Sequence, residues 1–466
     1  MGAEISGIPG ITIACTGFPK QAIIVGQGYG FPKIRIAEYP GHISTHEVET
    51  RRQNYREVVL PQVIKLLTEP AKDQASAKAS EPAPQEIVFK GTFEEVNKLF
   101  RENMWSDGLP IVPPTIAKVK EFLKFTDRSP DEVIGAYLPD NREATIWKIA
   151  VNGVMAGCRP EYMPILIAIA EAMATPEFRI QDGGSTPGWE AAIILNGTML
   201  RDTLGFNFKE GVRRPGYQAN TSIGRFYRLF ARNVPRLLPG ITDKATFGQM
   251  FRAVIPENEE ETAKMGWPPL SVQRGFKAGD NVVTIFSVRY EGAPLTTTGE
   301  RAEDHLDRIA LWMSRVIDVG LWYTATTAPT QKALALLLSP KVASVIAKGG
   351  YSFEEMRKYL FEHSKIPARE WDTLITSYIW PQKATACDLV QKGKPWKLPP
   401  QFCESKDPSR LLPLYYSPDQ LMIIVTGDPD RNRSLLLVNN QEQGYPVSKK
   451  IQLPDNWEKL LSELPK

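Results

Sequence analysis

Cys158 is the side chain whose sequence neighbours most favour reactive chemistry. It lies in the segment Asn152-Gly153-Val154-Met155-Ala156-Gly157-Cys158-Arg159-Pro160-Glu161-Tyr162. We expect one helix to end at Gly157 and another to begin after Pro160, which places Cys158 at a tight corner. A helix N-terminus and the adjacent Arg159 would stabilise the thiolate, and Glu161 would act as a nearby acid or base. The alternative is a tight turn around a small buried cysteine.

A second candidate is a basic helix that we expect over residues 220–233. Its first residues, Asn220, Thr221 and Ser222, are of types that cap helices. Basic side chains then recur every three or four residues along one face, at Arg225, Arg228, Arg232 and Arg236. A helix N-terminus beside several arginines suits a carboxylate or phosphate. We therefore predict that Asn196, Asn220, Arg225 and Arg228 bind a substrate; the alternative is that the arginines pair with acids of the same domain.

A third candidate is the pair His42 and His46, two of only 4 histidines in the chain. On one face of a helix, a spacing of four residues would let both ligate a metal ion. Pro40 and Gly41 make the stretch a turn that enters a helix, so this geometry is not guaranteed. A metal ion is thus one option for a cofactor that the sequence leaves unspecified.

Composition limits the class of protein. The chain has 466 residues, of which 42% are hydrophobic and 23% charged, with a formal net charge of +3. This is ordinary globular composition, without the strongly basic face of a nucleic-acid binder. No stretch is apolar and long enough to span a membrane, and the N-terminus lacks the pattern of a signal peptide. We expect a cytoplasmic protein with four free, buried cysteines.

The elements that must position these side chains divide into a module and a large domain. Residues 11–15, 18–25, 33–37 and 46–67 read as strand, helix, strand and long helix, half of a doubly wound unit. This half is too small to bury a good core alone, so it should pack on the second domain or on another chain. We predict an α/β protein with a small doubly-wound-like half-module at 1–69, a flexible linker at 70–86 and a large mixed α/β domain at 87–466.

Within the large domain we expect helices and strands in alternation. Thr92-Phe93-Glu94-Glu95 is a capping box that opens a helix, and Ser352–Glu355 is another. Asp107-Gly108-Leu109-Pro110 marks a rigid turn. The predicted helices cover 144–156, 164–173, 220–233, 301–319 and most of 328–363, and the predicted strands cover 191–196, 282–288, 420–426 and 434–438.

Residues 7–68 resemble the C-terminal half of the UGSC-like selenoprotein family, which is named after a Sec/Cys-Gly-Ser-Cys motif. The resemblance rests on Gly7-Ile8-Pro9, the strand ending near Cys15, Phe18, Pro40-Gly41-His42 and Leu66-Leu67-Thr68. It implies an α/β half-unit beside a redox-active motif. That motif should lie upstream of Gly7, where this chain has only six residues, so either the function has changed or a second polypeptide supplies the missing half.

The rest of the chain resembles a bacterial domain of unknown function that is associated with that family. The matching residues are Asp107-Gly108-Leu109-Pro110, Val154-Met155-Ala156-Gly157-Cys158-Arg159-Pro160, Asn196-Gly197, Ala219-Asn220, Ile223-Gly224-Arg225 and Val447-Ser448-Lys449-Lys450-Ile451. The resemblance covers most of residues 90–451. It brings no reaction with it, because a shared fold does not imply a shared function.

Three functions remain open from the sequence. The first is a subunit of a bacterial enzyme that acts on a small anionic organic substrate, by thiol-dependent reductive cleavage or addition at a carbon–heteroatom bond, with a partner chain or a second copy. The second is a metal-dependent lyase or hydratase with His42 and His46 as ligands. The third is a non-catalytic subunit of such a complex. Nucleic acid and membrane are not expected as partners.

Overall fold

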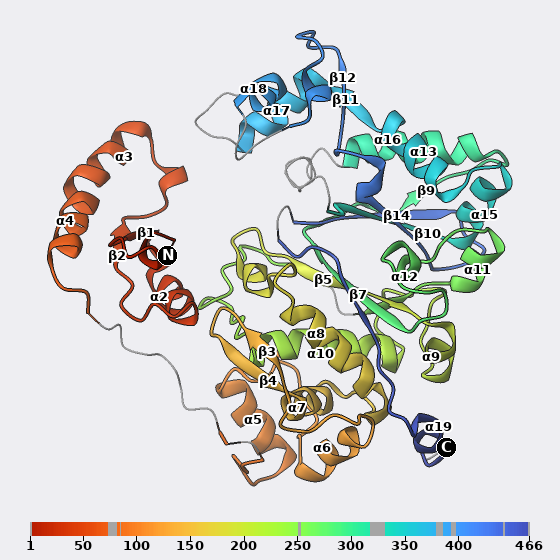
Figure 1. The fold of residues 1–466 in the computed structure, drawn as a ribbon, viewed down its shortest axis with the longest axis horizontal. Coiled ribbons are helices and arrows are strands. Elements are labelled where there is room, and N and C mark those ends of the chain that lie inside the picture. The colour runs from red at the N-terminus through yellow and green to blue at the C-terminus, as the bar shows by residue number, and fades with distance from the viewer. Residues whose placement is uncertain are drawn as a thin grey trace.

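The computed structural model describes residues 2–72, 82–83, 85–249, 253–316, 331–378, 385–392, 398–440 and 443–464. It has the expected α/β class, with helices and mixed sheets (Figure 1). Most of the linker predicted at 70–86 falls outside the described residues. Among the residues that are described, no helix has the length and apolar character needed to cross a bilayer.

The N-terminal module is built on two short parallel strands. Its elements are α1 (Gly2–Ile5), β1 (Thr12–Cys15), α2 (Pro19–Gly28), β2 (Ile36–Tyr39), α3 (Val48–Asn54), a π-helical turn (Tyr55–Val59) and α4 (Leu60–Thr68). Its small core joins Ala37 and Tyr39 of β2 to Val59. The module contacts the large domain through α2, where Gln21 donates to the Thr242 carbonyl at 2.9 Å. In Figure 1, α3 and α4 lie on the outer side of the module.

In the described part of the large domain, the two largest sheets pack face to face. One has the order β15-β7-β5-β6, and the other has the order β13-β10-β14-β8 with β9 beside β14. The first uses β5 (Glu190–Asn196), β6 (Val254–Pro256), β7 (Val282–Val288) and β15 (Val447–Lys450). The second uses β8 (Tyr290–Glu291), β9 (Leu295–Thr296), β10 (Leu334–Leu338), β13 (Leu421–Val425) and β14 (Arg433–Val438).

Helices cover the outer face of each sheet, which gives four layers in Figure 1. On the first sheet lie α7 (Ile146–Ala156), α8 (Met163–Ala174) and α10 (Gln218–Asn233), with α5 (Phe93–Glu102), α6 (Ile116–Leu123) and the hairpin β3 (Val133–Tyr137) and β4 (Arg142–Thr145) around them. On the second lie α13 (Ala302–Val316), α15 (Pro340–Lys348) and α16 (Phe353–His363). The remaining elements are α9 (Thr198–Thr203), α11 (Glu259–Lys264), α12 (Leu270–Gln273), β11 (Lys365–Pro367), α17 (Ala368–Tyr378), α18 (Ala386–Lys392), β12 (Leu411–Pro413) and α19 (Trp457–Ser462).

This layering explains why the strands read as continuous apolar runs. Along β5, Ile193 faces the helices and Ile194 faces the second sheet. Along β10, Leu336 faces helices and Leu337 faces the first sheet. Strands buried on both faces lose the alternation of a half-exposed strand. For the same reason the prediction that most of 328–363 is helical is wrong at Leu334–Leu338, which forms the strand β10.

The cysteines also differ from the sequence-based expectation. Cys387, in α18, and Cys403, at the end of a short 3₁₀ helix, form a disulfide. The prediction that all four cysteines are free is therefore wrong for this pair. Cys158 is free and buried, whereas Cys15 is free and only partly buried.

Candidate functional site

Cys158 lies at the predicted corner but in an environment opposite to the one expected. α7 ends at Ala156, and Gly157 adopts the left-handed conformation with a φ of 78°. The Cys158 side chain is buried in the core between the first sheet and its helices. Burial raises the pKa of the Cys158 thiol to about 12, although the neighbouring Ser222 hydroxyl and Arg225 guanidinium oppose the shift. The prediction of a low pKa is wrong because desolvation outweighs both stabilising groups.

Arg159 and Glu161 form an ion pair with each other. Arg159 is the N-cap of a 3₁₀ turn over Pro160–Tyr162, and its guanidinium lies 5.8 Å from the centre of the Tyr162 ring. The Glu161 side chain is 1% exposed, while that of Arg159 is 47% exposed. Glu161 therefore pairs with Arg159. The three residues predicted to be catalytic are thus a buried thiol, at Cys158, and an ion pair next to it in the sequence.

The arginines of α10 are matched by groups of the same chain. The Arg225 guanidinium binds Asp107, and that of Arg228 donates to Asp243 at 2.9 Å. Arg232 donates to the carbonyl of Met104, and Arg236, beyond the helix end, lies 3.5 Å from the Asp140 carboxylate. This geometry supports the alternative that the sequence left open, pairing with acids of the same domain, for Arg225, Arg228 and Arg236. Arg232 instead binds a main-chain carbonyl.

The two predicted amide ligands lie beside the neighbouring strands β5 and β6 of the first sheet. Asn220 lies within the first turns of α10, whose N-cap is Tyr217, and its amide bonds the main chain of Asn207 in both directions and the Val254 carbonyl. Asn196 ends β5 and donates from Nδ2 to Glu257 at 2.8 Å. Both amides are buried and form hydrogen bonds with other groups of the chain, so they connect strands to neighbouring loops.

Glu257 is an acid that the sequence analysis missed. It follows β6 directly and accepts hydrogen bonds from Asn196, from the Leu270 N–H at 2.7 Å and from the Val425 N–H at 3.4 Å. Burial, with a smaller effect of nearby Glu259, raises the pKa of Glu257 to about 8. Because Asn196 ends β5 of the first sheet and Val425 ends β13 of the second, this carboxyl group links the two sheets. A polar residue directly after an apolar strand was the available sequence signal.

His42 and His46 do not share a helical face. A 3₁₀ turn over Ile43–Thr45 separates them, with His42 as its N-cap. His42 Nδ1 lies 2.6 Å from the Ser44 hydroxyl, and His46 Nδ1 lies 2.9 Å from the Tyr39 hydroxyl. In the described part of the chain, no group of three or more His, Cys, Asp or Glu side chains could hold a metal ion. The predicted metal pair is thus two histidines that bind local hydroxyl groups.

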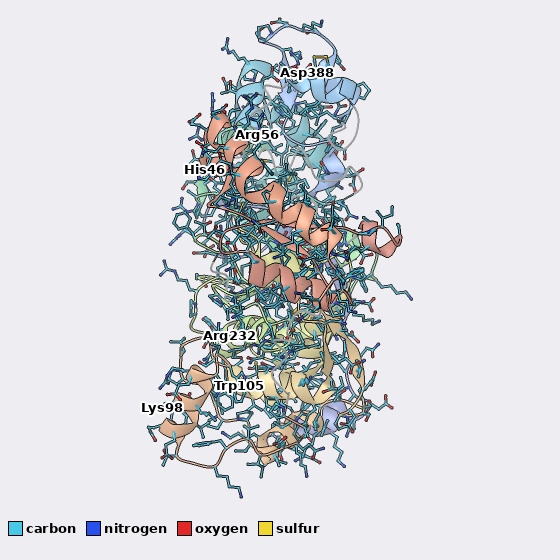
Figure 2. The ribbon with its side chains drawn as sticks, turned by 90° about the vertical axis from the view of Figure 1, so that its left-hand side faces the viewer. His46, Arg56, Lys98, Trp105, Arg232 and Asp388 are labelled. Carbon is cyan, nitrogen blue, oxygen red and sulfur yellow. A yellow bond between two sulfur atoms is a disulfide. The ribbon has the colours of Figure 1, made fainter. Side chains whose placement is uncertain are left out.

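A cavity of about 400 Å³ opens beside α7, α5 and the end of α10. Three aromatic side chains, Phe100, Trp105 and Trp147, form part of its wall, with Val151 and Met155 between them. Phe100 and Trp105 meet edge to face with ring centres 5.3 Å apart. In Figure 2, Trp105 lies near Arg232 and far from His46 on the N-terminal module. This volume is in the range of small-molecule sites.

Much of the polar part of the cavity wall comes from β4 and α7, and Gln85, Glu86 and Asn233 add to it. Thr145 caps α7 by accepting from the Lys148 N–H, which brings Lys148 back toward β4, where its Nζ donates to the Glu143 carbonyl at 2.9 Å. The basic side chains at the cavity, Arg142 and Lys148, are half-buried, whereas the acidic ones, Glu86 and Glu143, are exposed. Arg142 is ion-paired with Asp140 at 2.5 Å, so the basic group that this cavity presents beside its aromatic wall is Lys148. An aromatic wall with one half-buried lysine beside it suits a ring compound that carries one negative charge.

Comparisons of this chain with protein-family models, with curated protein sequences and with solved structures found no match. The geometry of the chain's own residues is therefore the basis for a function.

Proposed function

We propose that this chain is the small-molecule-binding subunit of an enzyme, and that the cavity beside α7 binds a small aromatic anion. The observation that carries the proposal is the wall made by Phe100, Trp105 and Trp147 next to the basic side chain of Lys148. A flat ring between such side chains buries apolar area, and a carboxylate near Lys148 gains a charge-assisted hydrogen bond.

The proposal excludes Cys158 as the reactive thiol of the reaction expected from the sequence. Thiol-dependent cleavage or addition needs a thiolate, and the Cys158 thiol is buried with a raised pKa. The proposal therefore gives Cys158 no part in the reaction and leaves the reactive group to a partner chain. If the isolated chain binds the ligand without converting it, the chain can be either an enzyme subunit or a non-catalytic subunit. If the ligand is converted only when the partner chain is added, the chain is an enzyme subunit.

The proposed compartment is the cytoplasm, as the sequence composition suggests. The Cys387–Cys403 disulfide argues against a cytoplasmic location, because disulfides persist mainly in oxidising compartments. Thiol counting on protein taken directly from cells decides between the two compartments.

The test is calorimetric titration of the full chain with 1-naphthoate and with the uncharged 1-naphthalenemethanol, which has a similar shape. We expect saturable binding of the acid and roughly tenfold weaker binding of the alcohol, since one charge-assisted hydrogen bond contributes about 1.5 kcal/mol. Lys148→Met should remove this difference. Val151→Phe fills the cavity without deleting core atoms and should abolish binding of both compounds.

Lys98→Met is the matched control, because Lys98 is an exposed lysine of α5 that pairs only weakly with Glu102 at 3.9 Å (Figure 2). It should bind 1-naphthoate as the wild type does. Equal binding of acid and alcohol would refute the anionic part of the proposal. If neither compound binds, or if Val151→Phe leaves binding unchanged, the cavity is not the ligand site.

A further inference from the structure

The small sheet of the N-terminal module has one covered edge. Gln62, in α4, forms two hydrogen bonds with the main chain of Glu38 in β2. The Glu38 N–H donates to Gln62 Oε1 at 2.9 Å, and Gln62 Nε2 donates to the Glu38 carbonyl at 3.0 Å. A side-chain amide thus occupies the hydrogen-bonding groups that a further strand would need on the β2 side.

Among the described residues, none forms such a cover on the β1 edge. The Thr12 N–H donates to the Arg35 carbonyl at 2.9 Å, so Thr12 faces β2. Because main-chain groups of successive residues in a strand point to opposite sides, the N–H and carbonyl of Ile13 point to the outer edge. The Ile13 side chain pairs with Ala37 on the face that α4 covers, yet it is 47% exposed. Ile11 and Cys15, on the same face, pack against the small core, so the cover over β1 has a gap at Ile13.

An apolar stripe on α4 overhangs this open edge. Leu60, Ile64 and Leu67 are 50%, 55% and 48% exposed. With 3.6 residues per turn, these positions share one side of α4, and the core-facing residues Val63 and Leu66 lie between them and Gln62. Gln62 marks the β2 side, so the stripe lies on the β1 side. Ile13 and the stripe together form a surface that we call the β1 face.

We propose that the β1 face joins two copies of this chain, with β1 of one copy pairing antiparallel to β1 of the other about Ile13. This register places Ile13 opposite Ile13 of the second copy and Ile11 opposite Cys15. It turns a two-stranded sheet into one of four strands, and isolated pairs of strands are marginal in water. The pairing is closed and symmetric, as in most soluble oligomers.

The charges beside the stripe favour a second copy over a partner of one dominant charge. Arg56 and Glu57 are both exposed, one turn before Leu60, and Figure 2 shows Arg56 on this outer side of the module. An apolar stripe bordered by both signs is complementary to itself under a two-fold rotation. The large domain lies against α2, as the Gln21–Thr242 hydrogen bond shows, and leaves the stripe exposed.

The decisive experiment is self-cross-linking of the full chain at position 13. The variant Ile13→Cys, in a Cys15→Ser background, should form a disulfide-linked homodimer under mild oxidation, because only a two-fold interface brings a residue close to its own copy. Light scattering after gel filtration should give twice the chain mass for the wild type. Ile13→Pro removes only an outward N–H at a sheet edge and should give the monomer with unchanged circular dichroism.

Ile64→Lys is a second variant that leaves β1 intact, and it should also give the monomer. Leu411→Lys changes a leucine in β12 that is 61% exposed and should leave the dimer unchanged. A monomeric wild type overturns the proposal, and so does a dimer that fails to cross-link at position 13. Cross-linking of Ile13→Cys to a different polypeptide would assign the β1 face to that partner. None of these outcomes depends on what the cavity binds.

Discussion

Arg225 holds the carboxylate of Asp107 with two hydrogen bonds, from Nε at 3.0 Å and from Nη2 at 2.9 Å. The two residues are 118 positions apart in the sequence. Nη2 also donates to the Pro110 carbonyl. The anion bound by Arg225 is therefore the chain's own turn at Asp107-Gly108-Leu109-Pro110, which is thereby fixed against α10.

The first prediction is that Arg225 is structural. Arg225→Ala removes the bidentate cation from the Asp107 carboxylate, whose side chain is 6% exposed. We expect a loss of about 3 kcal/mol in the free energy of unfolding, as for broken buried ion pairs. Denaturant unfolding of Arg225→Ala, Asp107→Ala and the double variant measures the coupling. Arg214→Ala, at an exposed arginine, is the control. If Arg225→Ala is as stable as the wild type, Arg225 is not structural and is again a candidate for ligand binding.

Local sequence patterns predict many of the helices and strands, but they do not predict which side chains contact one another in the folded protein. Both predicted capping boxes, Thr92 with Glu95 and Ser352 with Glu355, are formed. The apolar runs predicted as strands include β7 at the expected bounds. The sequence predicts a helix at Leu334–Leu338, because a short leucine-rich segment has no period that separates a buried strand from a helix. Cys158 shares a core with many distant residues and interacts with Ser222 and Arg225 of α10, so its local sequence neighbours could not indicate this environment.

The second prediction concerns the order in which the free thiols react. A thiol with a pKa of about 12 is almost wholly protonated at neutral pH, and the thiolate is the form that reacts. Cys158 should therefore be alkylated by iodoacetamide much more slowly than the partly buried Cys15. Timed labelling with peptide mapping measures this. In denaturant both cysteines should label at similar rates, and fast labelling of Cys158 in the native protein would contradict its buried placement.

The third prediction is a thiol count. With Cys387 and Cys403 joined, denatured but unreduced protein should show two reactive thiols, and reduction should raise the number to four. A disulfide that closes a loop of 16 residues contributes about 3 kcal/mol to stability in the chain-entropy account. Cys387→Ser should accordingly lower the stability of the segment around α18. Four thiols before reduction would show that the pair is reduced under the conditions of purification.

The last prediction is a pH dependence of stability that Glu257 controls. Burial raises the pKa of this carboxyl group in the folded protein to about 8. The folded state then binds a proton more tightly than the unfolded state, so unfolding releases a proton between the two pKa values. Stability is complete below the unfolded pKa, falls as the pH rises toward 8 and is flat above it, with a slope of at most about 1.4 kcal/mol per pH unit.

Glu257→Gln tests this reasoning. The glutamine keeps a carbonyl that can accept from the Leu270 N–H but cannot ionise, so the fall in stability between pH 5 and 8 (roughly the window between the two pKa values) should disappear. Denaturant unfolding at a series of pH values provides the measurement, and Glu94→Gln, at an exposed position of α5, should leave the wild-type slope in place. A slope that survives in Glu257→Gln would mean that another buried acid, with Glu259 the nearest, carries the effect, since burial also raises the pKa of Glu259.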